Sequence, residues 1–127
     1  MKNFFTTFLL LIILNLNAQN VSRVYKVESK TFEIKKKYAV QEIILISDST
    51  YVHKNYRLDN KSQKKIYRDF DCVKTEGTYK KEGAFYLFKP NNQNFEIGRY
   101  KISDNKIIYF YDWKKNKIRR GAEYKRI

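Results

Sequence analysis

His53 is the only histidine among the 127 residues, so zinc sites and catalytic triads built from several histidines are excluded. A histidine acts as a general base or a metal ligand only when partner side chains are placed around it. The candidate partners, acidic and thiol groups between residues 69 and 76, have a spacing that resembles no metal site. We therefore predict an ordinary exposed or half-buried histidine, with no bound metal and no other cofactor.

Asp69, Asp71 and Glu76 are the acidic cluster among those partners. Asp69 and Asp71 would share one face of an extended strand, which in principle suits Ca²⁺ or a pair of glycosidase carboxylates. The cluster has basic neighbours in sequence, Arg68 and Lys74, and the positive charge of the chain disfavours cation binding. A salt-bridged surface is the preferred interpretation. The sequence also lacks nucleophile-elbow, zinc-protease and phosphate-loop motifs, so we predict that the protein is not an enzyme.

Cys72 is the only cysteine, so an internal disulfide is excluded. In an oxidising compartment it could form a bridge to a second molecule. A buried thiol that packs as a small apolar side chain is the preferred alternative.

Positive charge is the most unusual property of the chain, since 27 Lys and Arg residues against 13 Asp and Glu residues give a formal net charge of +14. Lys, Asn, Ile, Tyr and Phe are abundant, a skew typical of AT-rich genomes, so part of this charge reflects codon usage. Two stretches nevertheless combine dense cations with aromatic residues, Trp113 in one and Tyr56 and Tyr67 in the other. Their candidate ligand-binding residues are Trp113, Lys114, Lys115, Lys117, Arg119 and Arg120, and Arg57, Lys61, Lys64, Lys65 and Arg68.

Such stretches predict attraction of an anionic glycan, a lipid or lipopolysaccharide, acting over roughly 8–10 Å at physiological salt. Trp113 would add a flat stacking face if it is exposed. A solvated turn followed by an edge strand protected by charge explains the same residues around Trp113 and remains the alternative.

The first 18 residues have the pattern of a signal peptide. Lys2 precedes an apolar stretch over residues 4–14, and Ala18 provides a small residue for cleavage. The stretch is shorter than the roughly 20 residues that a membrane-spanning helix needs. We expect cleavage after residue 18 and export to the periplasm or the medium. Residues 19–127 would then form a single domain without a membrane span, and nucleic acid is disfavoured as a partner.

Short runs of β-branched and aromatic residues, separated by polar turns, predict an all-β fold for residues 19–127. Residues 43–56 have the pattern of a hairpin whose Ser and Asp side chains bond the turn backbone. We expect about eight to ten strands in an antiparallel up-and-down meander that forms a small barrel or half-barrel. The first ten residues after cleavage suit a strand or a short helix, residues 58–62 suit a turn, and Gly121 suits a bulge or bend in a closing strand. The expected core residues are Ile44, Ile46, Tyr79, Phe85, Leu87, Ile102 and Ile108.

The hairpin at residues 43–56, followed by two Gly-x-Tyr-Lys hairpins at Gly77 and Gly98, resembles the small secreted lipocalin-like β-barrel proteins of bacteria. The resemblance covers about residues 43–112. It implies an antiparallel barrel, with or without a short N-terminal helix, and binding rather than catalysis.

Two functions remain open on these grounds. The first is an exported, non-catalytic binding protein for an anionic or hydrophobic molecule of the cell envelope. The second is a small envelope-associated or inhibitory protein that binds another protein through the barrel exterior. An apolar cavity inside the barrel would favour a small ligand, and a filled core would favour surface recognition.

Overall fold

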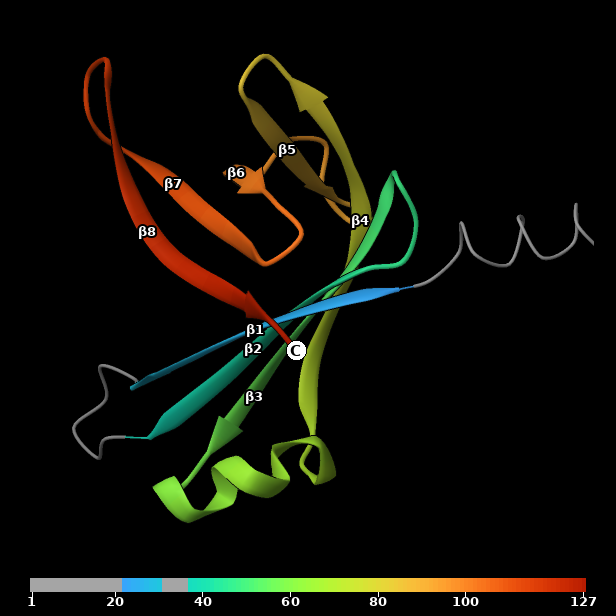
Figure 1. Cartoon of the computed structure of the whole chain (residues 1–127), viewed down its shortest axis with the longest axis vertical. Coiled ribbons are helices and arrows are strands. Elements are labelled where there is room, and N and C mark those ends of the chain that lie inside the picture. The colour runs from blue at the N-terminus through green and yellow to red at the C-terminus, as the bar shows by residue number, and fades with distance from the viewer. Residues whose placement is uncertain (1–21, 31–36) are drawn as a thin grey trace, which may run out of the picture.

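The computed structural model describes residues 22–30 and 37–127, in which eight antiparallel strands close into a small barrel (Figure 1). Each strand pairs with its neighbours in sequence, and β8 returns to pair with β1. This confirms the predicted all-β meander. The strands are β1 (Arg23–Lys30), β2 (Tyr38–Leu45), β3 (Thr50–Leu58), β4 (Cys72–Glu82), β5 (Phe85–Pro90), β6 (Arg99–Ile102), β7 (Lys106–Lys114) and β8 (Lys117–Arg126).

The first described residues of the domain form a strand, β1. The short helix considered as an alternative at the start of the domain is therefore not present at residues 23–30. β1 pairs with β2 along its whole length and with the end of β8 at Tyr25 and Lys26. The predicted signal peptide and the apolar residues at 32 and 34 lie outside the described residues. No helix among the described residues is long and apolar enough to cross a membrane.

The turn between β2 and β3 forms as its side chains predict. The Ser47 hydroxyl oxygen accepts hydrogen bonds from the backbone N–H groups of Ser49 and Thr50, at 3.3 and 3.2 Å. It also pairs with the Thr50 hydroxyl at 2.7 Å. These bonds satisfy the backbone where the sheet pairing stops and thereby fix the register of the hairpin.

A 3₁₀ helix, η1 (Lys61–Asp69), follows β3 where the sequence predicted only a turn at residues 58–62. Asn60 caps it, since its side chain accepts a hydrogen bond from the N–H of Gln63. Ile66 has non-helical backbone angles, so the helix is kinked. A short, kinked 3₁₀ helix lacks a sustained 3.6-residue period, which explains why the sequence pattern did not predict it.

The barrel interior is lined by the odd-numbered residues of β2 and β3, because alternate side chains of a strand face opposite sides. Ile43 and Leu45 are almost fully buried, whereas Ile44 is half-buried and Ile46 is 43% exposed. The prediction of Ile44 and Ile46 as core residues was therefore wrong by one residue. Along the rest of the sheet, Tyr79 and Ile108 are buried as predicted, but Phe85, Leu87 and Ile102 are only half-buried. The main core consists of Tyr25, Ile43, Leu45, Tyr51, Tyr79, Phe88, Tyr100, Ile107 and Tyr124.

A second apolar cluster lies on the opposite face of β2 and β3, where η1 packs against the sheet. Val40, Tyr56 and Leu58 from the strands and Tyr67 from the helix are buried there. Both faces of β2 are consequently covered, one by the barrel interior and the other by η1.

The β7–β8 ribbon contains two irregularities. Gly121 and Ala122 together lie opposite Tyr109, so the bulge or bend predicted at Gly121 is confirmed. On the other strand Trp113 is the additional residue between the pairs Asp112–Ile118 and Lys114–Lys117. Bulges of this kind increase the twist of a ribbon and redirect the side chains beside them.

Candidate ligand-binding cavity and surface sites

A cavity of about 390 Å³ lies on the inner face of the barrel wall and is partly open to solvent, and Ile97 and Ala122 are the exposed residues of its lining. This volume falls within the roughly 300–1,000 Å³ typical of small-molecule sites. Most of the wall is aromatic or aliphatic. The lining residues are Gln41, Ile43, Tyr51, His53, Thr75, Phe88, Ile97, Tyr100, Tyr109, Ala122 and Tyr124.

A polar cluster on one side of the cavity is built from three strands. Gln41 of β2 and His53 of β3 face the interior, and their side chains meet with the His53 Nε2 atom 3.0 Å from the Gln41 Oε1 atom. The Tyr124 hydroxyl of β8 donates to the same Oε1 atom at 3.1 Å. Burial lowers the pKa of His53 below its usual value, so the imidazole is neutral at pH 7. His53 is half-buried, as predicted, and contributes to a hydrogen-bonded cluster of neutral groups.

The hydroxyl of Tyr51 is buried without a hydrogen-bond partner, and the residue is only 2% exposed. Its ring packs against Phe88 with the centroids 4.6 Å apart. The absence of a side chain at Gly77 leaves room for this ring. A Cβ atom there would lie 2.7 Å from the ring and 2.2 Å from the Lys89 carbonyl oxygen. An unpaired buried polar group costs about 1–3 kcal/mol. The hydroxyl oxygen has almost no accessible surface, so it is enclosed by protein atoms and does not face the open part of the cavity.

Tyrosine rings from β6, β7 and β8 complete the wall. The ring of Tyr109 lies between Gly98 and Gly121, where added Cβ atoms would approach it to 2.5 and 2.9 Å. Tyr100 packs beside it at a tilt, with the centroids 5.2 Å apart. Burial raises the pKa of Tyr100, and it raises the pKa of Tyr124 to about 12. These phenols are therefore neutral at pH 7 and can both donate and accept hydrogen bonds.

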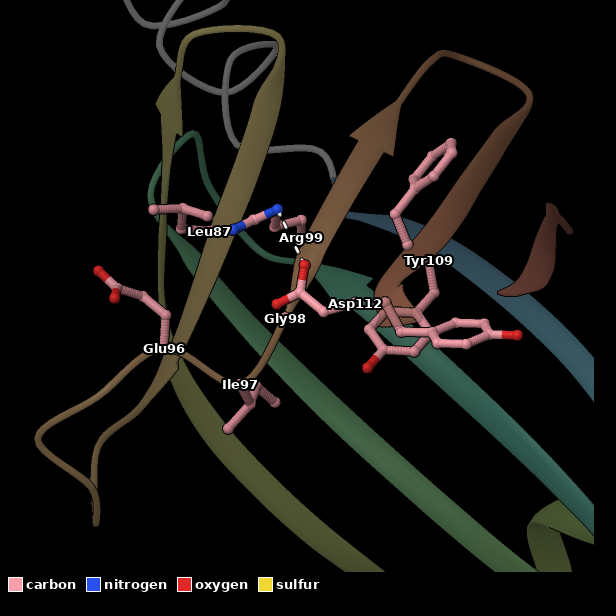
Figure 2. A pocket seen from close by; sticks show the side chains of 9 residues that line it. Leu87, Glu96, Ile97, Gly98, Arg99, Tyr109 and Asp112 are labelled. Atoms are coloured by element: carbon pink, nitrogen blue, oxygen red, sulfur yellow. Dashed lines mark hydrogen bonds and ion pairs between the residues drawn. The ribbon is translucent and has the colours of Figure 1, made fainter. Parts of the chain in front are cut away.

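A shallow groove of about 350 Å³ lies on the outer side of the same wall (Figure 2). Ile97 and Tyr109 line both the groove and the interior cavity, so they separate the two. Leu87 and Glu96 border the groove, and the Arg99 Nη1 atom lies 3.2 Å from the Asp112 Oδ1 atom across it. This ion pair is exposed and connects β6 to β7.

The first predicted basic stretch gathers at the tip of the β7–β8 hairpin. Trp113 is 48% exposed, and the guanidinium of Arg119 lies over its ring, 3.8 Å from the centroid. Lys114, Lys115 and Lys117 are exposed around the turn. The last member of the stretch, Arg120, instead forms a 2.8 Å ion pair with Glu123.

The second predicted basic stretch holds η1 on the sheet. The Arg68 guanidinium contacts both carboxylate oxygens of Glu42, at 2.9 and 3.3 Å, and Glu42 is 2% exposed. Lys64 lies 3.4 Å from Glu28 of β1. The other members, Arg57, Lys61 and Lys65, are exposed, while the accompanying Tyr56 and Tyr67 are buried in the cluster under η1.

The acidic and thiol groups near residue 70 are dispersed. Glu76 pairs with Lys74 at 2.9 Å, as predicted, and Asp69 and Asp71 are exposed. Cys72 is half-buried and packs against the cluster under η1. Across residues 22–30 and 37–127 no three His, Cys, Asp or Glu side chains lie close enough to hold a metal ion together.

Of the cavity residues, sequence reasoning considered His53 and named no others as candidates for chemistry. The available signal was polar residues at inward positions of apolar strands, as at Gln41 two residues before Ile43. Comparison of the chain with protein-family models, with curated proteins and with solved structures gave no match in any of the three.

Proposed function

We propose that this chain is an exported, non-catalytic binding protein that takes a small, largely apolar molecule into the barrel interior. The cavity is the observation that carries the proposal, because an aromatic wall there surrounds a few polar atoms, the composition typical of ligand sites. His53 is engaged by an amide and the phenols are neutral, which favours holding a ligand over transforming it.

Filling the mouth of the cavity should abolish binding. Ala122 is an exposed rim residue, so Ala122→Trp places a large ring at the entrance with little effect on the core. We expect affinity for the uncharged fluorescent probe N-phenylnaphthylamine to fall at least about tenfold, the factor of roughly 1.4 kcal/mol. Ala84→Trp, in the exposed β4–β5 turn, is the matched control and should bind as the wild type does. Equal binding by the two variants would contradict an interior site.

A second candidate function is recognition of an anionic envelope molecule, a glycan, lipid or lipopolysaccharide, at the tip of the β7–β8 hairpin. Three lysines and an exposed tryptophan at this tip favour it. The pairing of β7 with β6 ends at Phe110, so residues 111–114 have an edge toward β6 without a described strand partner. That edge also suits a protein partner on the barrel exterior.

The hairpin candidate predicts that position matters as well as charge. Changing Lys114, Lys115 and Lys117 to Gln should weaken binding to vesicles containing anionic lipid at least about fivefold at low salt, and added salt should reduce the difference. A variant with Lys81, Lys89 and Lys125 changed to Gln loses the same charge at dispersed exposed sites outside both basic stretches. Equal losses in a vesicle co-sedimentation assay would leave only a generally basic surface.

Export predicts the mass of the mature chain. Protein recovered outside the cytoplasm should lack residues 1–18, and intact-mass spectrometry measures this directly. Soluble extracellular protein that retains Met1 would contradict the proposed cleavage.

A further inference from the structure

The wall of the barrel cavity carries no full charge at neutral pH. Its lining contains no Lys, Arg, Asp or Glu, and its single histidine is neutral. A charged group on a ligand would lose its hydration there without gaining a counterion, which is strongly unfavourable. The cavity thus differs from the chain as a whole, which has a formal net charge of +14.

The hydrogen-bonding groups of the wall limit the chemistry of a ligand further. The Gln41 Oε1 atom already contacts two groups, His53 and Tyr124. The Tyr51 hydroxyl is unpaired but has almost no accessible surface, so it is not offered to a molecule in the cavity. The phenols of Tyr100 and Tyr124 in the lining can donate to a carbonyl or accept from a hydroxyl, and both partners can be neutral.

The tilted, closely packed rings of the wall favour an aromatic ligand. Tyr51, Phe88, Tyr100 and Tyr109 form a continuous series with successive centroid separations of 4.6, 4.4 and 5.2 Å. Such a wall offers flat faces and ring edges to a planar molecule, which can stack or pack edge-on against it.

We infer that the cavity binds an uncharged aromatic or polycyclic molecule with a hydroxyl or carbonyl group, and that it discriminates against anions. This inference rests on the proposed interior site and specifies its ligand class. It contradicts the simplest expectation from the net charge, which is an anionic ligand.

Two probes of one shape test the inference, namely naphthol and naphthoate. Each is titrated against the full mature chain by displacement of N-phenylnaphthylamine, and only displacement that Ala122→Trp abolishes is counted, because surface binding survives a plugged cavity. We expect naphthol to bind at least about tenfold more tightly than naphthoate, since the carboxylate loses hydration without a counterion.

A cation added at the rim of the cavity should invert the preference for naphthol over naphthoate. Ala122→Arg supplies the missing counterion and should raise naphthoate affinity at least about fivefold relative to naphthol. Ala84→Arg adds the same charge in the remote β4–β5 turn and should change neither affinity.

The outcomes separate this inference from the proposed function. If Ala122→Trp abolishes binding but the affinity for naphthoate equals or exceeds that for naphthol, the neutral ligand class is overturned and the interior site remains supported. Absence of any binding that Ala122→Trp abolishes, N-phenylnaphthylamine included, would overturn the proposed function itself.

Discussion

Replacement of Phe88 by alanine is expected to lower the free energy of unfolding by about 3–5 kcal/mol. Phe88 is 1% exposed, and its ring lies among those of Tyr51, Tyr79 and Tyr100, with centroid separations of 4.6, 5.3 and 4.4 Å. Removing it deletes the centre of this aromatic cluster. The rigid barrel and the adjoining cavity would not collapse to fill the space, so the cost should be near the upper end of that range. Urea denaturation followed by circular dichroism measures it.

The matched control is the adjacent residue. Leu87 is half-buried and borders the outer groove, so Leu87→Ala should cost only about 0.5–1.5 kcal/mol (Figure 2). Comparable losses for the two variants would mean that the inward face of β5 is assigned incorrectly.

The fold class was predictable because its signals are local. Strand-length apolar runs, the Ser47 turn and the bulge at Gly121 each depend on a few neighbouring residues, and the structure contains all three. Closure of the meander into a barrel then follows from short connections between antiparallel neighbours.

The inward face of β2 was not predictable, and η1 is the physical reason. Its helix buries Val40 and Glu42 on the outer face, while Ile43 and Leu45 fill the barrel. A strand covered on both sides has no polar alternation, so its sequence does not indicate which residues face the barrel. The helix itself is too short and irregular to predict from periodicity.

The cavity could not be predicted because its lining comes from seven different strands and the loop before β6. Gln41, His53 and Tyr124 are brought together only by the register of β2, β3 and β8 in the closed sheet. The cations near Trp113 are contiguous in sequence, which is why that cluster was identified from sequence alone. The position of Arg68 within a basic stretch did not indicate that it pairs with the buried carboxylate of Glu42, which is 26 residues away in sequence.

The Arg68–Glu42 pair is the basis of the second large effect. Glu42 is the one buried charged residue in the described part of the chain, and both of its oxygens contact the Arg68 guanidinium. Arg68→Leu should lower the free energy of unfolding by about 2–4 kcal/mol, because it leaves a buried carboxylate without its cation. The value is below that for a fully buried pair because the Arg68 side chain is 58% exposed and water already screens part of the interaction. Urea denaturation measures the loss, and hydrogen exchange should show η1 opening first.

Two further variants separate loss of the ion pair from loss of packing. Arg120→Leu breaks an exposed pair with Glu123 of similar geometry, at 2.8 Å, and should cost less than about 1 kcal/mol. Glu42→Leu combined with Arg68→Leu removes both charges and places two apolar side chains between η1 and β2. This double variant should recover most of the stability lost in Arg68→Leu, since an apolar contact can replace a buried ion pair with little net cost. If the double variant is instead as unstable as Arg68→Leu alone, the lost stability belongs to packing of the Arg68 stem on Tyr67, whose ring centroid lies 5.6 Å from the guanidinium carbon.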